Sequence, residues 1–379
     1  MSDSPIYLDY NATTPVLAEV VDAMLPYLRE HFGNPSSAHA LGRWAREAVE
    51  AARAHVAALL ECAPSEVVFT SGGTEASNLA IRGIAEGRRD RRHFVTSAIE
   101  HPATEKACAW LQEHGWHVTR AGVDAGGRVL IEEVRAAVSE HTALVTIMHA
   151  NNETGVVQPI AEIAEVAHAA GALVHCDAAQ SAGKIPVRVN ELHVDLLSLA
   201  GHKVYAPKGV GALFVRQGTP LLPFALGAGH ERGLRPGTEN VAPIVGLGVA
   251  CRRAKHDLVT EAERVQQLRD RLWERLAAEV PGIQLNGGGA PRLPNTLNVR
   301  FPGALGSRVL AAAPEVAAST GSACHDGQEQ ASAVILAMGV SSAEAVGSVR
   351  LTLGRQTTLE EVDRAAESLA RAWRASRQR

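Results

Sequence analysis

Short apolar segments alternate with amphipathic stretches over residues 66–215. The apolar segments are four or five residues long, and they predict strands at Val67–Thr70, Phe94–Ser97, Leu144–Met148, Leu173–Asp177 and Leu196–Leu199. Helical patterns between them predict helices at Thr74–Glu86, Ala103–Glu113 and Ile160–Ala169. Alternation of this kind is typical of βαβ units. We therefore expect an α/β fold with a mostly parallel sheet that is covered on both faces.

The pattern changes after residue 240. Apolar residues recur at helical spacing from Val241 to about Val280, where Pro281-Gly282 ends the pattern, so one long helix is predicted. The remaining residues predict strands at Thr296–Phe301, Val316–Thr320 and Ser348–Leu353, with helices between them. This second part is expected to form a smaller α+β domain.

Composition and charge exclude several classes of protein. The 379 residues carry a formal net charge of −4 with both signs interspersed, which argues against a nucleic-acid or anionic membrane surface. No apolar run is long enough to span a bilayer, and the first residues resemble neither a secretory signal nor a transit peptide, so we expect a cytoplasmic protein. The five cysteines form no Cys-x-x-Cys pair, and we expect neither a disulfide framework nor a metal site.

A glycine-rich turn follows the first predicted strand. Ser71-Gly72-Gly73-Thr74-Glu75 ends that strand and opens a helix, where free N–H groups and the helix dipole can bind an anion. A simple strand-to-helix turn with Thr74 as the cap explains the motif equally well.

Two further motifs stand after predicted strands. Asp177 lies where ligands bind in an open α/β sheet, and a carboxylate there can keep a pyridine nitrogen protonated, although a helix cap would look the same. Lys203 follows in Gly201-His202-Lys203. A lysine in a partly apolar pocket can form a Schiff base, although most lysines are solvated surface charges.

The order and spacing of the motifs resemble those of a known family. The series runs through Gly72-Gly73-Thr74, Glu100-His101-Pro102, Asn151-Asn152-Glu153, Asp177 with Gln180, and Gly201-His202-Lys203. It resembles fold-type I pyridoxal-phosphate (PLP) enzymes of the class V aminotransferase group. Within that group the chain is similar, over nearly its whole length, to cysteine desulfurases of the NifS/IscS type. The resemblance implies a large PLP-binding domain at residues 15–255 and a small domain formed by residues 1–14 and 256–379.

The resemblance also implies a role for each matching residue. Lys203 would bond PLP covalently and then move the α-proton of the substrate, and Asp177 would pair with the pyridine nitrogen. Arg350 would bind the substrate carboxylate with its planar guanidinium, although a surface arginine at a strand edge would read the same. The remaining implied contacts are Gly73, Thr74, His202 and the partner subunit's Thr238 to the phosphate, His101 to the ring face, Asn152 and Gln180 to the phenolic oxygen, and Asn34 to the substrate.

Cys324 is the expected nucleophile. It lies in a run of small and polar residues, Ser319 to Gly327, which is typical of a loop that can move between a substrate and an acceptor. Isolated cysteines are usually buried and inert, but this polar setting with His325 beside the thiol favours a reactive thiolate. The prediction is a persulfide on Cys324 and L-alanine from L-cysteine.

The sequence departs from the family pattern at a few positions. Ala200 replaces a serine that many members place on the PLP phosphate, and Cys324-His325 is similar to selenocysteine-lyase-like members. Selenocysteine lyase or another class V enzyme is therefore an alternative, and a cofactor-free scaffold is a further one. The expected partners are a second copy of the chain and a sulfur-acceptor protein, for iron–sulfur assembly or another thio-transfer pathway.

Overall fold

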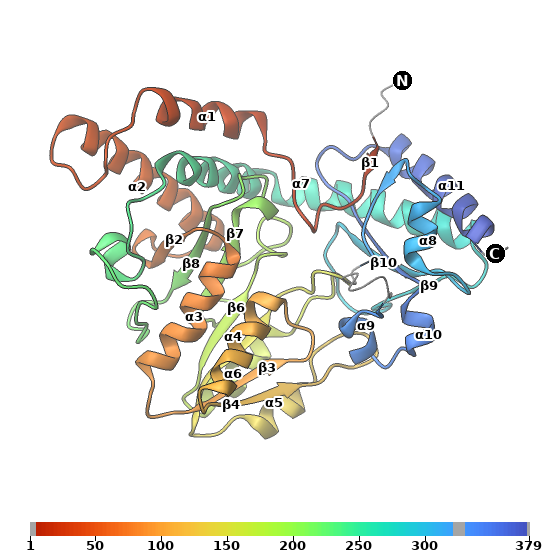
Figure 1. Ribbon diagram of the computed structural model, residues 1–379, viewed down its shortest axis with the longest axis horizontal. Coiled ribbons are helices and arrows are strands. Elements are labelled where there is room, and N and C mark those ends of the chain that lie inside the picture. The colour runs from red at the N-terminus through yellow and green to blue at the C-terminus, as the bar shows by residue number, and fades with distance from the viewer. Residues whose placement is uncertain (1–4, 321–329, 377–379) are drawn as a thin grey trace.

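The computed structural model describes residues 5–320 and 330–376. Its main feature is a seven-stranded sheet in the order β2-β8-β7-β6-β5-β3-β4 (Figure 1). Strand β8 runs antiparallel to both of its neighbours, and the other pairs are parallel. The strands are β2 (Val67–Thr70), β3 (His93–Ser97), β4 (His117–Ala121), β5 (Thr142–Met148), β6 (Leu173–Asp177), β7 (Leu196–Ala200) and β8 (Gly211–Val215).

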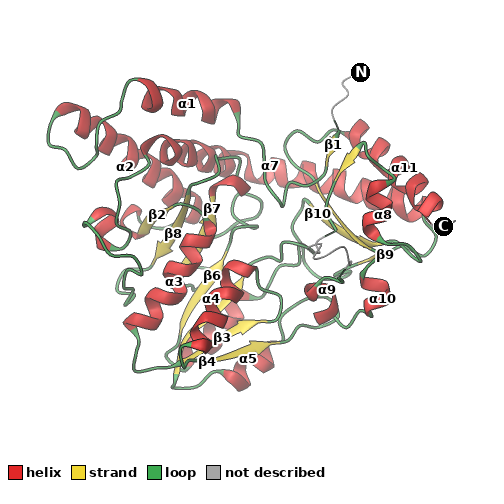
Figure 2. Ribbon diagram, viewed as in Figure 1, coloured by secondary structure: helices red, strands yellow, loops and turns green. Residues whose placement is uncertain are grey.

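Helices cover this sheet on both faces, as the alternating pattern predicted (Figure 2). Strands β5 and β7 are buried along their whole length, because a parallel sheet between two helix layers has no solvent-facing side. The helices of this part are α1 (Ala18–Arg29), α2 (Ala40–Leu60), α3 (Gly73–Gly87), α4 (Pro102–Glu113), α5 (Ile131–Ala137) and α6 (Ile160–Ala169), with 3₁₀ turns η1 (Pro64–Glu66), η2 (Gly201–Lys203) and η3 (His230–Gly233).

A second, smaller group of strands lies beside the main sheet. Strands β12 (Ser348–Thr352), β10 (Thr296–Arg300) and β9 (Gln284–Leu285) form an antiparallel sheet, and β1 (Ile6–Tyr7) pairs with β11 (Val316–Ala317). The helices of this group are α8 (Gly306–Ala311), α9 (Ala333–Ala337), α10 (Ser342–Ala345) and α11 (Leu359–Ser376). Strand β11 is shorter than predicted, and beyond it Ser319 pairs with Arg350 through an isolated bridge.

Helix α7 (Val241–Glu279) runs from one group to the other. Its first half packs against α1 and α2, and its second half packs against α11. The helix contributes to two of the hydrophobic cores in the same way, since Ala254 belongs to the first and Val265 to the second. The expected domain boundary at residue 255 falls inside this helix, and the division stays a prediction. In addition, Val334 and Ile335 of α9 pack against the first core.

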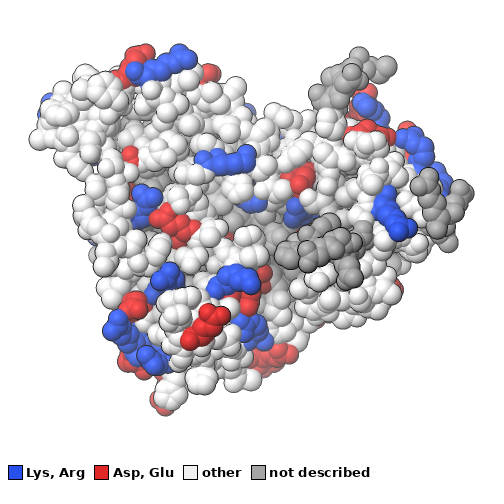
Figure 3. All heavy atoms as spheres, in the orientation of Figure 1, with Lys and Arg blue, Asp and Glu red and all other residues white. Residues whose placement is uncertain are grey.

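Within the described residues, no helix has the length and apolar character needed to cross a bilayer. On the face of the molecule in Figure 3, acidic and basic side chains lie interspersed among uncharged ones.

Candidate active site

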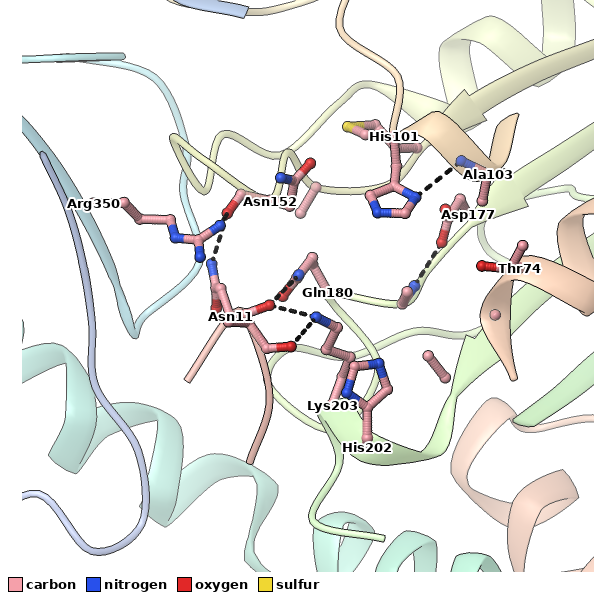
Figure 4. A pocket seen from close by; sticks show the side chains of 16 residues that line it. Asn11, Thr74, His101, Ala103, Asn152, Asp177, Gln180, His202, Lys203 and Arg350 are labelled. Atoms are coloured by element: carbon pink, nitrogen blue, oxygen red, sulfur yellow. Dashed lines mark hydrogen bonds between the residues drawn. The ribbon is translucent and has the colours of Figure 1, made fainter. Parts of the chain in front are cut away.

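The carboxyl ends of the parallel strands lie along one edge of the main sheet. Most of the predicted site residues lie at these ends or in the loops that follow them. A cavity of about 390 Å³ opens at this edge. Figure 4 shows side chains from both groups of strands converging on it. The cavity is lined by Asn11, Ala12, Gly73, Thr74, His101, Ala103, Met148, Ala150, Asn152, Asp177, Ala179, Gln180, Ala200, His202, Lys203 and Arg350. Ligands bind at this edge in open α/β sheets because the strand-to-helix loops converge there.

The turn between β2 and α3 forms one end of the cavity. Gly72 caps α3 with a φ of 153°, a conformation that side chains disfavour, and the first helical residues are Gly73 and Thr74. The unpaired N–H groups and the dipole of this helix start suit a phosphate. His202 lines the same cavity, and burial together with nearby lysines lowers its pKa to about 4.

Asp177 lies at the carboxyl end of β6 and is 8% exposed. One carboxylate oxygen accepts the Ala179 N–H at 2.9 Å, and no basic side chain of the described residues forms an ion pair with it. Burial raises the pKa of Asp177. A buried carboxylate in a cavity, without a cationic partner, fits a protonated pyridine nitrogen.

The imidazole of His101 faces the cavity at the start of α4. Its Nδ1 accepts the Ala103 N–H at 3.1 Å, and Pro102 occupies the first helical position. Burial lowers the pKa of His101, an effect that Asp177 opposes and Lys203 reinforces. We infer a neutral ring that carries its proton on Nε2 and presents a flat face to the cavity.

Lys203 reaches the cavity from the 3₁₀ turn after β7. Its Nζ donates to the main-chain oxygens of Asn11 at 2.5 Å and Ala12 at 2.7 Å. Burial, with Arg350 as the next cause, lowers its pKa to about 8. An amine that loses its proton near neutral pH can act as a nucleophile and a base.

Arg350 belongs to β12 of the small sheet and closes the cavity from the other side. Its Nη2 donates to Asp9 Oδ1 at 2.7 Å and its Nη1 to the Asn152 main-chain oxygen at 3.1 Å. The residue is 7% exposed, and its Nε has no hydrogen-bond partner within the described chain. A guanidinium with free donors beside a cavity suits a carboxylate ligand.

The structure brings together nine of the predicted site residues, namely Gly73, Thr74, His101, Asn152, Asp177, Gln180, His202, Lys203 and Arg350. Asn34 and Thr238 do not line this cavity, and both are exposed. Cys324 and His325 lie outside the described residues. The last described residues before them include Ser319, which donates to Asp9 Oδ2 at 2.9 Å.

Three residues at the site had no role assigned from the sequence. Asn11 connects the two groups of strands, because its main-chain oxygen accepts Lys203 and its side chain donates to Thr296. Asp9 holds Arg350, and Lys184 lies behind the cavity wall. Each is more than a hundred residues from a partner that it contacts, so sequence spacing gave no signal for these contacts.

The comparisons with known proteins agree with this geometry. A family model described as aminotransferase class-V matches residues 6–365, and the chain belongs to this family. Its fold is that of the fold-type I PLP enzymes, and it is a PLP-dependent enzyme by family, with residues that fit the cofactor's phosphate, ring nitrogen and aldehyde.

Within the family, the similar proteins share one name. A cysteine desulfurase IscS of Anaeromyxobacter sp. is 49% identical over 95% of this chain and 90% of its own length. A cysteine desulfurase IscS of Methanosarcina thermophila is 46% identical over 96% of this chain and 90% of its own length. Among solved structures, a NifS-like protein superimposes with a TM-score of 0.90 at 37% identity, covering 97% of this chain and 98% of its own. SspA in complex with cysteine gives 0.83 at 38% identity, with 93% and 99% covered.

Proposed function

We propose that this protein is a cysteine desulfurase, which converts L-cysteine to L-alanine and keeps the sulfur as a persulfide on Cys324. One observation carries the proposal: Lys203 from the turn after β7, Asp177 from the end of β6 and Arg350 from β12 face a single cavity. An amine, a buried carboxylate and a carboxylate-binding guanidinium are what a PLP enzyme acting on an amino acid needs.

We assign each part of the cofactor to a region of the cavity. The phosphate would lie at the start of α3 near Thr74 and His202, and the ring would stack on His101. Asp177 would hold the ring nitrogen protonated. Gln180 and Asn152 would be within reach of the phenolic oxygen. Bound in this way, PLP supplies an electron sink that makes the α-proton of an amino acid acidic.

The substrate is oriented by Arg350 and deprotonated by Lys203. Arg350 would bind the α-carboxylate through its free donors, which places the α-carbon near the Lys203 amine. Because the pKa of Lys203 is lowered to about 8, this amine can accept the α-proton near neutral pH.

Sulfur transfer needs a thiolate, which we assign to Cys324. Its sulfur would attack the sulfur of the substrate, so that an S–S bond forms as the C–S bond breaks. The electron pair of the broken bond stays with the carbon skeleton, which is protonated to give alanine. The described cysteines suit this role poorly, because burial raises the pKa of the thiols of Cys62, Cys108 and Cys251 to about 12.

The decisive experiment is Cys324→Ser with Cys62→Ser as the matched control. Mixed with L-cysteine, the Cys324 variant is expected to form almost no alanine and no protein-bound persulfide, while still binding PLP. The control is expected to form both, with a mass gain of one sulfur atom on the peptide that contains Cys324. Full alanine production by the Cys324 variant would refute the persulfide assignment.

Selenocysteine lyase is the second candidate, favoured by the Cys324-His325 pair. Selenium leaves carbon more readily than sulfur, so that activity need not require the thiolate. Retained alanine production from selenocysteine by the Cys324 variant, with loss from cysteine, would support it.

We further propose a homodimer that passes its sulfur to an acceptor protein. The exposed Thr238 supports the homodimer, because this residue lies outside the cavity of its own subunit and could reach the cavity of a partner subunit.

A further inference from the structure

Lys184 is a half-buried lysine that the proposed mechanism does not use. It lies four residues after Gln180, in the segment that joins β6 to β7. Its Nζ donates to Gln180 Oε1 at 3.0 Å and to Asn11 Oδ1 at 3.2 Å. Lys184 does not line the cavity, but both of its partners do.

The surroundings of this amine are electrostatically unfavourable for a cation. No described carboxylate forms an ion pair with Lys184, and the charged neighbours that influence it, Lys203 and Arg350, carry the same sign. Burial, followed by these two neighbours, lowers its pKa to about 7. An amine that is partly removed from water and has no counter-ion costs stability that an apolar side chain would not. Such groups cluster at functional sites.

The hydrogen bonds of Lys184 to Gln180 and Asn11 define how these two side chains are oriented near Lys203. A lysine amine donates its hydrogens, so the Gln180 carbonyl must face Lys184 and its Nε2 must face away. That Nε2 donates to the Asn11 main-chain oxygen at 3.0 Å, the oxygen that also accepts Lys203. The Asn11 side-chain oxygen is held from a second direction by Asn295 at 3.0 Å.

We propose that Lys184 is a positioning residue that orients the Gln180 amide and Asn11 around Lys203 and the cofactor. This inference rests on the proposed function and extends it to a residue outside the cavity. Loss of Lys184 frees the Gln180 amide to rotate, which removes a defined donor from the phenolic oxygen of PLP. It also removes a positive charge from the neighbourhood of Lys203, Arg350 and His202.

The test compares Lys184→Met with Lys208→Met. Lys208 is exposed and influences His202 electrostatically, so its variant removes the same charge without touching Gln180 or Asn11. For each protein, the measurements are the PLP dissociation constant, the pH midpoint of the visible absorption of the PLP-bound protein, and the thermal unfolding midpoint without PLP.

For Lys184→Met we expect PLP to bind roughly tenfold or more weakly, because hydrogen bonds from a charged donor are lost. We also expect the pH midpoint to rise, since removing a positive charge favours the protonated form of the lysine-bound cofactor. Lys184→Arg should restore the midpoint toward the wild-type value. Lys208→Met should leave PLP binding unchanged.

An unchanged PLP dissociation constant and an unchanged midpoint in Lys184→Met, with a lower unfolding midpoint, would show a purely structural lysine and overturn the proposal. If Lys184→Met does not fold, Lys184→Gln decides by the same criteria, because it keeps a donor without the charge. A wild-type protein that gives no visible band with PLP would instead refute the proposed function itself.

Discussion

Glu100 carries a carboxyl group with a buried oxygen, and no catalytic role explains it. Its Oε1 accepts the Ser97 hydroxyl at 2.5 Å and the Met148 N–H at 3.1 Å, whereas Oε2 has no partner in the described chain. Burial raises the pKa of Glu100 to about 8. Asp177 is close enough to contribute to this raised pKa. A neutral Glu100 therefore adds no second negative charge near Asp177.

This raised pKa predicts a pH-dependent effect of Glu100→Gln on stability. The unfolded carboxyl ionises near its ordinary pKa and the folded one only near 8, so the wild type loses stability as pH rises between these values. Each pKa unit corresponds to about 1.4 kcal/mol, and glutamine has no proton to lose. The variant should therefore gain stability relative to wild type from pH 5 to about pH 8, measured by denaturant unfolding. Glu113 is exposed, so the stability difference between Glu113→Gln and the wild type should not change with pH. If the difference for Glu100→Gln is also independent of pH, the prediction is wrong.

Arg350 is expected to act on substrate binding and not on cofactor binding. Arg350→Ala removes the donors that face the substrate carboxylate, and losing such a contact costs on the order of 2–5 kcal/mol. The apparent KM for cysteine should rise strongly while the visible absorption of bound PLP is retained. Arg355→Ala is the control, because Arg355 pairs with Asp257 outside the cavity. Unchanged cysteine turnover in Arg350→Ala would remove Arg350 from the site.

The residue pattern by itself could single out only those site residues that stand at or just after the ends of strands, and the resemblance supplied the others. Asp177 and Lys203 could be found because strand ends are visible in the pattern and converge in a parallel sheet. The roles of Asp9, Asn11 and Lys184 could not be found, because they depend on contacts between the N-terminal segment and distant strands. Only the packing of the two groups of strands brings these residues together.

At the scale of elements, charged side chains cover the outer side of the edge strand β2, away from the cavity. Strand β2 is the last strand of the sheet, and its Phe69 N–H donates to Glu231 Oε2 at 2.8 Å. Its Val67 carbonyl accepts Arg53 at 2.9 Å and Arg232 at 2.7 Å. These contacts occupy backbone groups that could otherwise pair with another strand.

The same contacts hold the segment that precedes Thr238. Glu231 and Arg232 have φ values of 46° and 58°, which are unfavourable for residues other than glycine. Arg53 binds both oxygens of Glu231 at 2.7 Å, and this buried pair stabilises the unfavourable conformation. Farther along, Arg235 donates to Glu75 Oε1 at 2.9 Å, directly beside Thr74.

Glu231→Gln should therefore destabilise the protein strongly. It removes the buried counter-charge of Arg53 and leaves only the exposed Glu50, and loss of one partner costs about 3–5 kcal/mol in buried pairs. Chemical denaturation of the variant measures this loss. Glu50→Gln is the control, because Glu50 also contacts Arg53 but its side chain is 56% exposed, and we expect at most about 1 kcal/mol there. Equal losses of stability in the two variants would show that the buried pair of Arg53 and Glu231 contributes no more than the exposed one.

The elements that the sequence did not predict have identifiable physical causes. Strand β4 lies at the sheet edge and alternates exposed and partly buried residues, so its polar composition conceals it. Strand β8 contains Gly211, which lets the strand approach Gly72 and Leu199 more closely than a side chain would allow. Strands β5 and β7 were predicted because their continuous apolar runs alternate with helical patterns.

At the scale of the whole molecule, the proposed homodimer would complete the proposed site. Thr238, assigned to the PLP phosphate by resemblance, is exposed and does not line the cavity of its own subunit. The ion pair between Arg235 and Glu75 holds this segment close to the phosphate turn, and Thr238 follows three residues later. This arrangement is what a site shared across a two-fold interface requires, because each subunit then supplies its Thr238 to the other.

Mixing two inactive variants tests this arrangement. Lys203→Ala lacks the essential amine and Thr238→Ala lacks the partner's phosphate contact, so each homodimer has two defective sites. A mixed dimer builds one site with both residues intact and one with neither, and random exchange gives about one quarter of all sites intact. Alanine production should therefore appear on mixing and follow subunit exchange, which is measured separately with labelled chains. Unmixed variants serve as controls. Proven exchange without recovered activity would show that Thr238 serves its own subunit or none, and would refute the shared site.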